Sequence, residues 1–98
     1  SIYSSTKIAV ESITKSLSKE LSRFNIRVNC IAPGLIDTEM LNDNTSEKSI
    51  EQTLKRISSK RIGRPEDISN LLYFLCSKES DYINGEVISI DGGLSVDG

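Results

Sequence analysis

Two short apolar strand patterns, separated by a long stretch of helical pattern, constrain the fold of this 98-residue chain more than any other feature. The first covers residues 26–32 and ends at Pro33-Gly34, and the second covers residues 86–90. Both are apolar at most positions, as expected of strands that helices cover on both faces. Strands joined by a helical crossover pair in parallel, so the sequence predicts an α/β fold.

The first helix is predicted over residues 4–24, ahead of the first strand. Its apolar residues recur at spacings of three and four, which makes one stripe along the helix: Val10, Ile13, Leu17, Leu21 and Phe24. We expect this stripe to be the buried face of the helix. Asn25 favours a helix stop directly after it.

Two more helices are predicted between the strands. A short one covers residues 47–58 and follows a polar, turn-prone stretch at 42–46. The other covers residues 65–77 and starts at a proline followed by two acidic residues, which suit the positive end of a helix dipole. Its apolar residues form a dense stripe: Ile68, Leu71, Leu72, Leu75 and Cys76. Two parallel strands make a poor independent sheet, so the pattern predicts half of a layered architecture.

The composition argues against several classes of function. Twelve basic residues stand against fourteen acidic ones, so binding to nucleic acid or to an anionic membrane has no electrostatic support. No apolar run approaches the ~20 residues that cross a bilayer. Histidine is absent, which excludes the usual zinc sites and a Ser-His-Asp or Cys-His nucleophile within this chain. Cys30 and Cys76 lie in apolar segments and predict reduced, buried thiols of a cytoplasmic protein.

Tyr3 and Lys7 are the candidate catalytic residues. They lie four residues apart at the start of the first helix, so their side chains share one face. A phenol has an ordinary pKa of about 10, and a cation about 5 Å away lowers that pKa toward neutrality. Tyr3 could then serve as a general acid/base. The alternative is an exposed helical pair without chemistry, and only the surrounding motifs decide between the two.

Four further motifs follow the Tyr3–Lys7 pair in order. Residues 25–34 read Asn-Ile-Arg-Val-Asn-Cys-Ile-Ala-Pro-Gly, and residues 35–38 read Leu-Ile-Asp-Thr. Residues 63–68 read Gly-Arg-Pro-Glu-Asp-Ile, and residues 84–93 read Asn-Gly-Glu-Val-Ile-Ser-Ile-Asp-Gly-Gly. This succession resembles the C-terminal part of the classical short-chain dehydrogenase/reductase family, most closely its 3-oxoacyl-acyl-carrier-protein reductase branch.

The resemblance implies a fold and a domain organisation. Residues 1–98 would form the C-terminal half of a Rossmann-like, doubly wound parallel sheet within a single domain. Its parts would be a catalytic helix at 4–24, a strand at 26–32, a substrate lid at 35–62 that includes Met40, a helix at 65–77 and a strand at 86–90. The dinucleotide-binding half is absent from the sequence, because no glycine-rich strand-to-helix turn precedes Tyr3.

The resemblance also implies roles for individual residues. Tyr3 would give a proton to the carbonyl oxygen, and Lys7 would lower the Tyr3 pKa and hydrogen-bond the nicotinamide ribose. Pro33 and Gly34 would bring the backbone close to the nicotinamide.

Two more residues would meet the cofactor beyond that point. Ile36 would present backbone groups to the carboxamide, and the Thr38 hydroxyl would meet the carboxamide or the pyrophosphate. Taken alone, these residues favour packing at Ile36 and a helix cap at Thr38; beside Tyr3 and Lys7 the cofactor contacts are favoured instead.

The implied function is that of an oxidoreductase using NADP or NAD. It would reduce a ketone to a secondary alcohol, as in 3-oxoacyl-acyl-carrier-protein reduction in fatty acid synthesis. The helix from Pro65 and the final strand would pack against another subunit of a cytoplasmic homotetramer, with no metal, nucleic acid or membrane involved. Two alternatives stay open: a dehydrogenase for a sugar, a steroid or another small alcohol, and a non-catalytic oligomerisation module.

Overall fold

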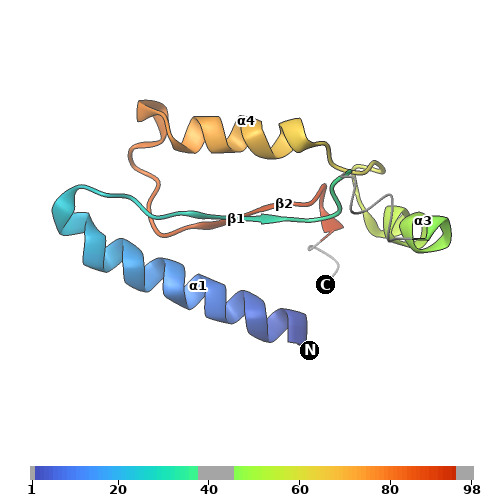
Figure 1. Ribbon diagram of the computed structural model, residues 1–98, viewed down its shortest axis with the longest axis horizontal. Coiled ribbons are helices and arrows are strands. Elements are labelled where there is room, and N and C mark those ends of the chain that lie inside the picture. The colour runs from blue at the N-terminus through green and yellow to red at the C-terminus, as the bar shows by residue number, and fades with distance from the viewer. Residues whose placement is uncertain (1, 38–45, 95–98) are drawn as a thin grey trace. The chain divides into compact units, whose positions relative to one another are not determined.

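The computed structural model describes residues 2–37 and 46–94, with the backbone alone at residues 2–4 and Thr6 (Figure 1). Its elements are α1 (Ile2–Leu21), the 3-10 helix η1 (Ser22–Phe24), β1 (Cys30–Pro33), α3 (Glu47–Arg56), α4 (Pro65–Leu75), the 3-10 helix η2 (Lys78–Ser80) and β2 (Val87–Ile90). The chain divides into two compact units: unit 1 is Ser1–Ile31 with Leu72–Ile88, and unit 2 is Ala32–Leu71 with Ser89–Gly98.

The two strands form one two-stranded sheet, and each contributes residues to both units. In unit 1 the Cys30 amide donates to the Glu86 carbonyl at 2.8 Å. In unit 2 the Gly34 amide donates to the Ile90 carbonyl, also at 2.8 Å. Both strands therefore advance in the same direction, which is the parallel pairing that a helical crossover requires. The predicted α/β class is confirmed.

The first strand is shorter than the expected range 26–32, since β1 begins only at Cys30. Side chains replace the ladder in the preceding residues: the Val28 amide donates to Asn84 Oδ1 at 3.0 Å, and Asn29 Oδ1 accepts from the Glu86 amide at 3.1 Å. Residues 26–29 alternate like a strand, and the Val28 carbonyl accepts from the Gly85 amide at 2.8 Å, but the side chains of Asn84 and Asn29 interrupt the regular ladder there. The expectation of a strand over these four residues is wrong for that reason.

Helix α1 buries a different face from the expected apolar stripe. Thr14 and Ser18 are buried, whereas Ile13, Leu17 and Phe24 are 59%, 40% and 58% exposed. The buried hydroxyls bond back to helix carbonyls: Thr14 Oγ1 donates to Val10 O at 2.8 Å, and Ser18 Oγ donates to Lys15 O at 2.9 Å. Small polar side chains can therefore occupy this face, and the expected stripe is wrong as a description of what unit 1 buries.

The turn before β2 packs against this polar face of α1 within unit 1. Gly85 has a φ of 81°, and a Cβ atom added there would lie 2.8 Å from Ser18 Oγ. Asn84 Nδ2 donates to Ser22 Oγ at 3.0 Å, and Lys15 Nζ donates to the Gly85 carbonyl at 3.5 Å. The helix itself ends as expected, because Asn25 adopts the left-handed conformation that asparagine tolerates.

Arg27 ties together the loop that follows α4 in unit 1. Its Nη2 donates to the Leu75 carbonyl at 2.9 Å. Its Nη1 donates to the carbonyls of Ser80 and Ile83 at 2.9 and 3.1 Å. Asn29 Nδ2 adds a bond to the Ile83 carbonyl at 3.0 Å. A single guanidinium therefore bonds three carbonyls, each of which also accepts from a second donor in unit 1.

Helix α4 starts at Pro65 as expected and ends at Leu75, two residues before the predicted end. Leu75 is 8% exposed, whereas Leu72 is 52% exposed and Cys76 is exposed. Cys30 is half-buried, and both thiols are free. The expectations of a fully buried α4 stripe and of a buried Cys76 are therefore wrong. The sequence pattern marks the apolar residues of α4, of which this chain buries only part.

In unit 2, α3 is capped by Ser46, whose Oγ accepts from the Ser49 amide at 3.2 Å. The chain then reaches Ile57, which is 1% exposed and packs beside Gly92. The Ser59 amide donates to the Gly92 carbonyl at 2.9 Å. The small core of unit 2 thus joins the segment after α3 to the segment after β2. Residues 38–45 of the expected lid, Met40 among them, lie outside the described residues.

Candidate active site

Helix α1 holds both candidate catalytic residues. Its backbone is helical from Ile2, so Tyr3 and Lys7 are separated by one turn and occupy one face. Lys7 is half-buried. The side chain of Tyr3 lies outside the described part of the chain, so its distance from Lys7 stays a prediction.

In unit 2, Pro33 is the last residue of β1 and Gly34 follows it at a point of close approach. A Cβ atom added at Gly34 would lie 2.6 Å from Asp91 Cβ and 2.9 Å from Asp91 Cα. Because the neighbouring atoms belong to backbone and Cβ, a side chain would force the two segments apart. Glycine is therefore needed here for packing within unit 2, a reason that strand termination alone does not supply.

Ile36 joins the segment after β1 to the segment before α4. Ile36 and Gly63 form an isolated parallel bridge. The Gly63 amide donates to the Leu35 carbonyl, and the Asp37 amide donates to the Gly63 carbonyl, both at 2.8 Å. Residues 35–37 are consequently fixed by backbone bonds on both sides of Ile36. Thr38 lies outside the described residues.

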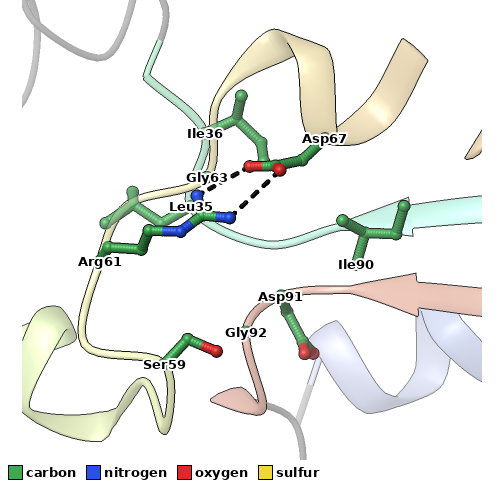
Figure 2. A pocket seen from close by; sticks show the side chains of 9 residues that line it. All are labelled: Leu35, Ile36, Ser59, Arg61, Gly63, Asp67, Ile90, Asp91 and Gly92. Carbon is green, nitrogen blue, oxygen red and sulfur yellow. Dashed lines mark hydrogen bonds and ion pairs between the residues drawn. The ribbon is translucent and has the colours of Figure 1, made fainter. Parts of the chain in front are cut away.

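A cavity of about 210 Å³ opens where the two strands end in unit 2 (Figure 2). Residues from three segments line it: Leu35, Ile36, Ser59, Arg61, Gly63, Asp67, Ile90, Asp91 and Gly92. Parallel α/β sheets bind ligands at the carboxyl ends of their strands, which is where this cavity lies. Its volume is below the ~300–1,000 Å³ of a typical small-molecule pocket.

An ion pair stands at the rim of the cavity. Arg61 Nη1 and Nη2 donate to the two Asp67 carboxylate oxygens at 2.8 and 3.1 Å, shown as dashed lines in Figure 2. The Arg64 amide also donates to Asp67 Oδ2, at 2.7 Å. The Arg61 hydrogen bonds, followed by the Arg64 amide, lower the pKa of Asp67 to about 2. The same partnership raises the pKa of Arg61.

Sequence reasoning identified Ile36 as a site residue but missed the residues that surround it. Gly63 and Asp67 belong to the motif at residues 63–68, and Asp91 and Gly92 belong to the motif at residues 84–93. The spacing of an acidic residue three places after an N-cap position marks a capping box, and that signal points to Asp67. The pairing of Ile36 with Gly63 has no local signal, because it joins residues far apart in the chain.

Comparison with known proteins shows the class of protein to which this arrangement belongs. A family model described as enoyl-(acyl carrier protein) reductase matches residues 1–95. The 3-oxoacyl-acyl-carrier-protein reductase FabG of Thermotoga maritima is 46% identical over 94 residues, and a tropinone reductase homolog of Arabidopsis thaliana is 42% identical over 99 residues. The chain belongs to the short-chain dehydrogenase/reductase family.

A solved structure gives the same relationship in three dimensions. The putative 2-deoxy-d-gluconate 3-dehydrogenase of Agrobacterium tumefaciens, solved with bound NADP, matches 96% of this chain with a TM-score of 0.84 and 35% identity. The match covers 39% of that protein. The alignments to the Thermotoga and Arabidopsis relatives cover 96% and 100% of this chain and 38% of each relative. The chain thus spans well under half the length of the proteins it matches.

Proposed function

We propose that this chain works as the C-terminal portion of a Rossmann-like oxidoreductase that reduces a ketone to a secondary alcohol with NADP or NAD. The substrate we propose is a 3-oxoacyl group carried on acyl carrier protein. The observation that carries the proposal is the helical turn between Tyr3 and Lys7 on α1, in a chain 46% identical to a 3-oxoacyl-acyl-carrier-protein reductase. A complete enzyme of this kind would also need a dinucleotide-binding half.

The residues of unit 2 fit the nicotinamide end of such a cofactor. Leu35 and Ile36 line a cavity at the carboxyl ends of parallel strands, and its volume suits a ring with its carboxamide. A bound nicotinamide cofactor would supply the hydride. Gly34 and Ile36 would hold the backbone against the ring and carboxamide, and Pro33 would direct the strand end toward them. Thr38 would add a hydroxyl beyond Ile36.

The chemistry of the chain itself is proton transfer. The Tyr3 hydroxyl would donate a proton to the substrate carbonyl oxygen as the carbon is reduced, leaving a phenolate. Lys7 would stabilise that phenolate, since opposite charges one helical turn apart attract. It would also hold the nicotinamide ribose by a hydrogen bond. General acid catalysis of this kind contributes about 10²–10⁴ in rate.

We further propose that the complete protein is a cytoplasmic homotetramer. Subunit contacts would involve α4 and β2, and the exposed apolar residues of α4 support this: Leu72, Tyr73 and Phe74 are 52%, 82% and 42% exposed. Among the described residues, no helix is both long and apolar enough to cross a membrane. Exposed apolar residues on one helix are typical of a surface that another chain covers.

Substitution of Tyr3 tests the function in the complete protein. Tyr3→Phe should lower kcat by about 10²–10⁴ while the dissociation constant for the nicotinamide cofactor stays unchanged. Lys7→Ala should lower kcat and also weaken cofactor binding, because it loses both proposed contacts. Steady-state kinetics with 3-oxoacyl-acyl-carrier protein and cofactor titration by calorimetry measure the two effects. Near-normal turnover in Tyr3→Phe would dismiss the catalytic role.

A second substrate class is supported by the relatives. The tropinone reductase homolog matches the whole of this chain at 42% identity, and the NADP-bound neighbour is named for a sugar-acid substrate. A panel of a 3-oxoacyl-acyl-carrier protein, a bicyclic amino ketone and a keto sugar acid separates these classes by kcat/KM. A protein that binds no nicotinamide cofactor and reduces none of them would instead be a non-catalytic oligomerisation module.

A further inference from the structure

Gly63 fixes the position of the segment that is proposed to contact the nicotinamide. Its amide bonds to the Leu35 carbonyl and its carbonyl accepts from the Asp37 amide, so one residue fixes both neighbours of Ile36. The contact is close: a Cβ atom at Gly63 would lie 2.5 Å from Ile36 Cδ1 and 3.3 Å from the Leu35 carbonyl oxygen. The position of residues 35–37 therefore depends on the position of Gly63.

Gly63 is in turn enclosed by an ion pair between residues on either side of it. Arg61 lies two residues before Gly63 and Asp67 four residues after it, and the two side chains meet in a bidentate contact (Figure 2). Arg61 Nη1 also donates to the Ile62 carbonyl at 3.1 Å. The Arg64 amide adds its bond to Asp67. These contacts close residues 61–67 into a ring of hydrogen bonds around Gly63.

Two roles can be separated within this ring. The bond from the Arg64 amide to Asp67 is half of a capping box and stabilises the start of α4. The bonds from Arg61 reach the same carboxylate but are not part of that cap, because Arg61 lies before the start of the helix. Arg61 instead restrains the backbone of residues 61–64, since a bidentate guanidinium–carboxylate pair fixes the relative orientation of the two side chains as well as their distance.

We propose that Arg61, paired with Asp67, is a positioning residue that acts through Gly63 to hold residues 34–37 where the cofactor nicotinamide binds. The inference rests on the proposed function for the identity of the ligand. The link from Arg61 to residues 35–37 rests on the contacts alone. Arg61 also lines the cavity, and the role proposed for it there is to position these residues.

The experiment substitutes Arg61 in the complete protein. Arg61→Met removes the pair and leaves the cap on the Arg64 amide, and Arg56→Met serves as the matched control because Arg56 is exposed at the end of α3 in the same unit. We expect Arg61→Met to raise the KM for the reduced nicotinamide cofactor about fivefold, the upper range for an exposed ion pair, with kcat at saturating cofactor unchanged. Arg61→Lys should recover part of the loss, since it keeps the charge without the fork.

Amide hydrogen exchange gives a readout that does not depend on activity. The amides of Gly63 and Asp37 should exchange several-fold faster in Arg61→Met than in the unmodified protein, and Arg56→Met should leave them unchanged. Equal exchange at these amides in the two variants would overturn the proposal. So would a loss in which kcat and KM change together with the melting temperature, because that pattern indicates general destabilisation.

The failure of the proposed function is distinguishable from the failure of this inference. If the unmodified protein oxidises no reduced nicotinamide cofactor with any ketone, the proposed function fails. The exchange comparison would then still decide whether Arg61 controls residues 35–37. If the unmodified protein is active and Arg61→Met matches Arg56→Met in cofactor KM, the positioning role fails while the proposed function stands.

Discussion

Inside each of the two units, a different kind of contact joins distant segments of the chain. In unit 1, long polar side chains reach backbone groups far along the sequence: Arg27 donates to three carbonyls, Asn29 accepts from the Glu86 amide, and Asn84 accepts from the Val28 amide. In unit 2, backbone groups bond each other directly at Gly34, Ser59 and Gly63. At Gly34 and Gly63, the absence of a Cβ atom lets the neighbouring segment come this close.

The difference determines which substitutions each unit tolerates. Unit 1 should be sensitive to the removal of atoms, because the loss of one side chain, as at Arg27, removes several hydrogen bonds at once. Unit 2 should be sensitive to the addition of atoms, because a Cβ at its glycines meets neighbours inside contact distance. Within the proposed chemistry, proton transfer is assigned to residues of unit 1, and cofactor contact to Lys7 of unit 1 and to residues of unit 2.

The largest effect on stability is expected at Arg27. Arg27→Met keeps the aliphatic stem and removes all three donors, so the free energy of unfolding should fall by about 3 kcal/mol. Arg23→Met is the matched control, since Arg23 is exposed and its guanidinium only lies over the Phe24 ring, 4.7 Å from its centre. Chemical denaturation of the complete protein measures both. Equal losses of unfolding free energy in Arg27→Met and Arg23→Met would contradict the expected sensitivity of unit 1 to side-chain removal.

Gly34→Ala should have the next largest effect, and it tests the expected sensitivity of unit 2 to added atoms. The added Cβ would meet Asp91 Cα and Cβ, neither of which can rotate away, so the free energy of unfolding should fall by about 2 kcal/mol. In the complete enzyme the KM for the cofactor should rise as well, because Gly34 belongs to the proposed contact segment. Ser59→Ala is a control that removes atoms in the same unit. We expect it to be nearly neutral, since the Ser59 contact to Gly92 is made by its amide.

The sequence predicted the order of elements and the parallel pairing, because periodicity and the long crossover are local or topological signals. It predicted Asn25 as the helix stop for the same reason. It failed for residues 26–29, which alternate like a strand but lie where the side chains of Asn29 and Asn84 interrupt the ladder with residues 84–86. Which acceptor a polar side chain finds depends on residues more than fifty positions away, and no window of sequence contains that information.

The exposed faces of α1 and α4 are the other instructive failure. Apolar spacing identified Ile13, Leu17 and Leu72 as core residues, yet all three are at least 40% exposed. Periodicity states which face of a helix is to be buried and says nothing about what buries it. For α4 we propose that another subunit covers the exposed apolar residues. At the candidate site, a sequence motif identifies Ile36, but no local signal predicts that Ile36 pairs with Gly63.

Gly85→Ala should have a smaller effect than Gly34→Ala, although both are glycines in close contact. The φ of 81° at Gly85 costs an alanine about 1–2 kcal/mol. Its steric neighbour is Ser18 Oγ, the end of a side chain that can rotate, so the clash itself is relieved cheaply. Gly85→Asn should lose less than Gly85→Ala, since asparagine tolerates the left-handed region. Thermal unfolding of the two variants measures the difference, and an equal loss would mean that the clash and not the dihedral angle dominates.

The smallest effect is expected from the protonation of Asp67. Its pKa is about 2 in the folded chain against an ordinary value of 3.8, so the carboxylate stabilises the fold fully above the ordinary value and progressively less as the pH falls through the folded one. The difference in melting temperature between the unmodified protein and Asp67→Asn should therefore be constant near neutral pH and shrink between about pH 4 and about pH 2. Glu66→Gln removes a charge from the same helical turn with no bond to Arg61, and its difference should not follow this curve. A difference for Asp67→Asn that stays constant down to pH 2 would mean that the pair with Arg61 does not stabilise unit 2, and that its backbone bonds hold the segments without help.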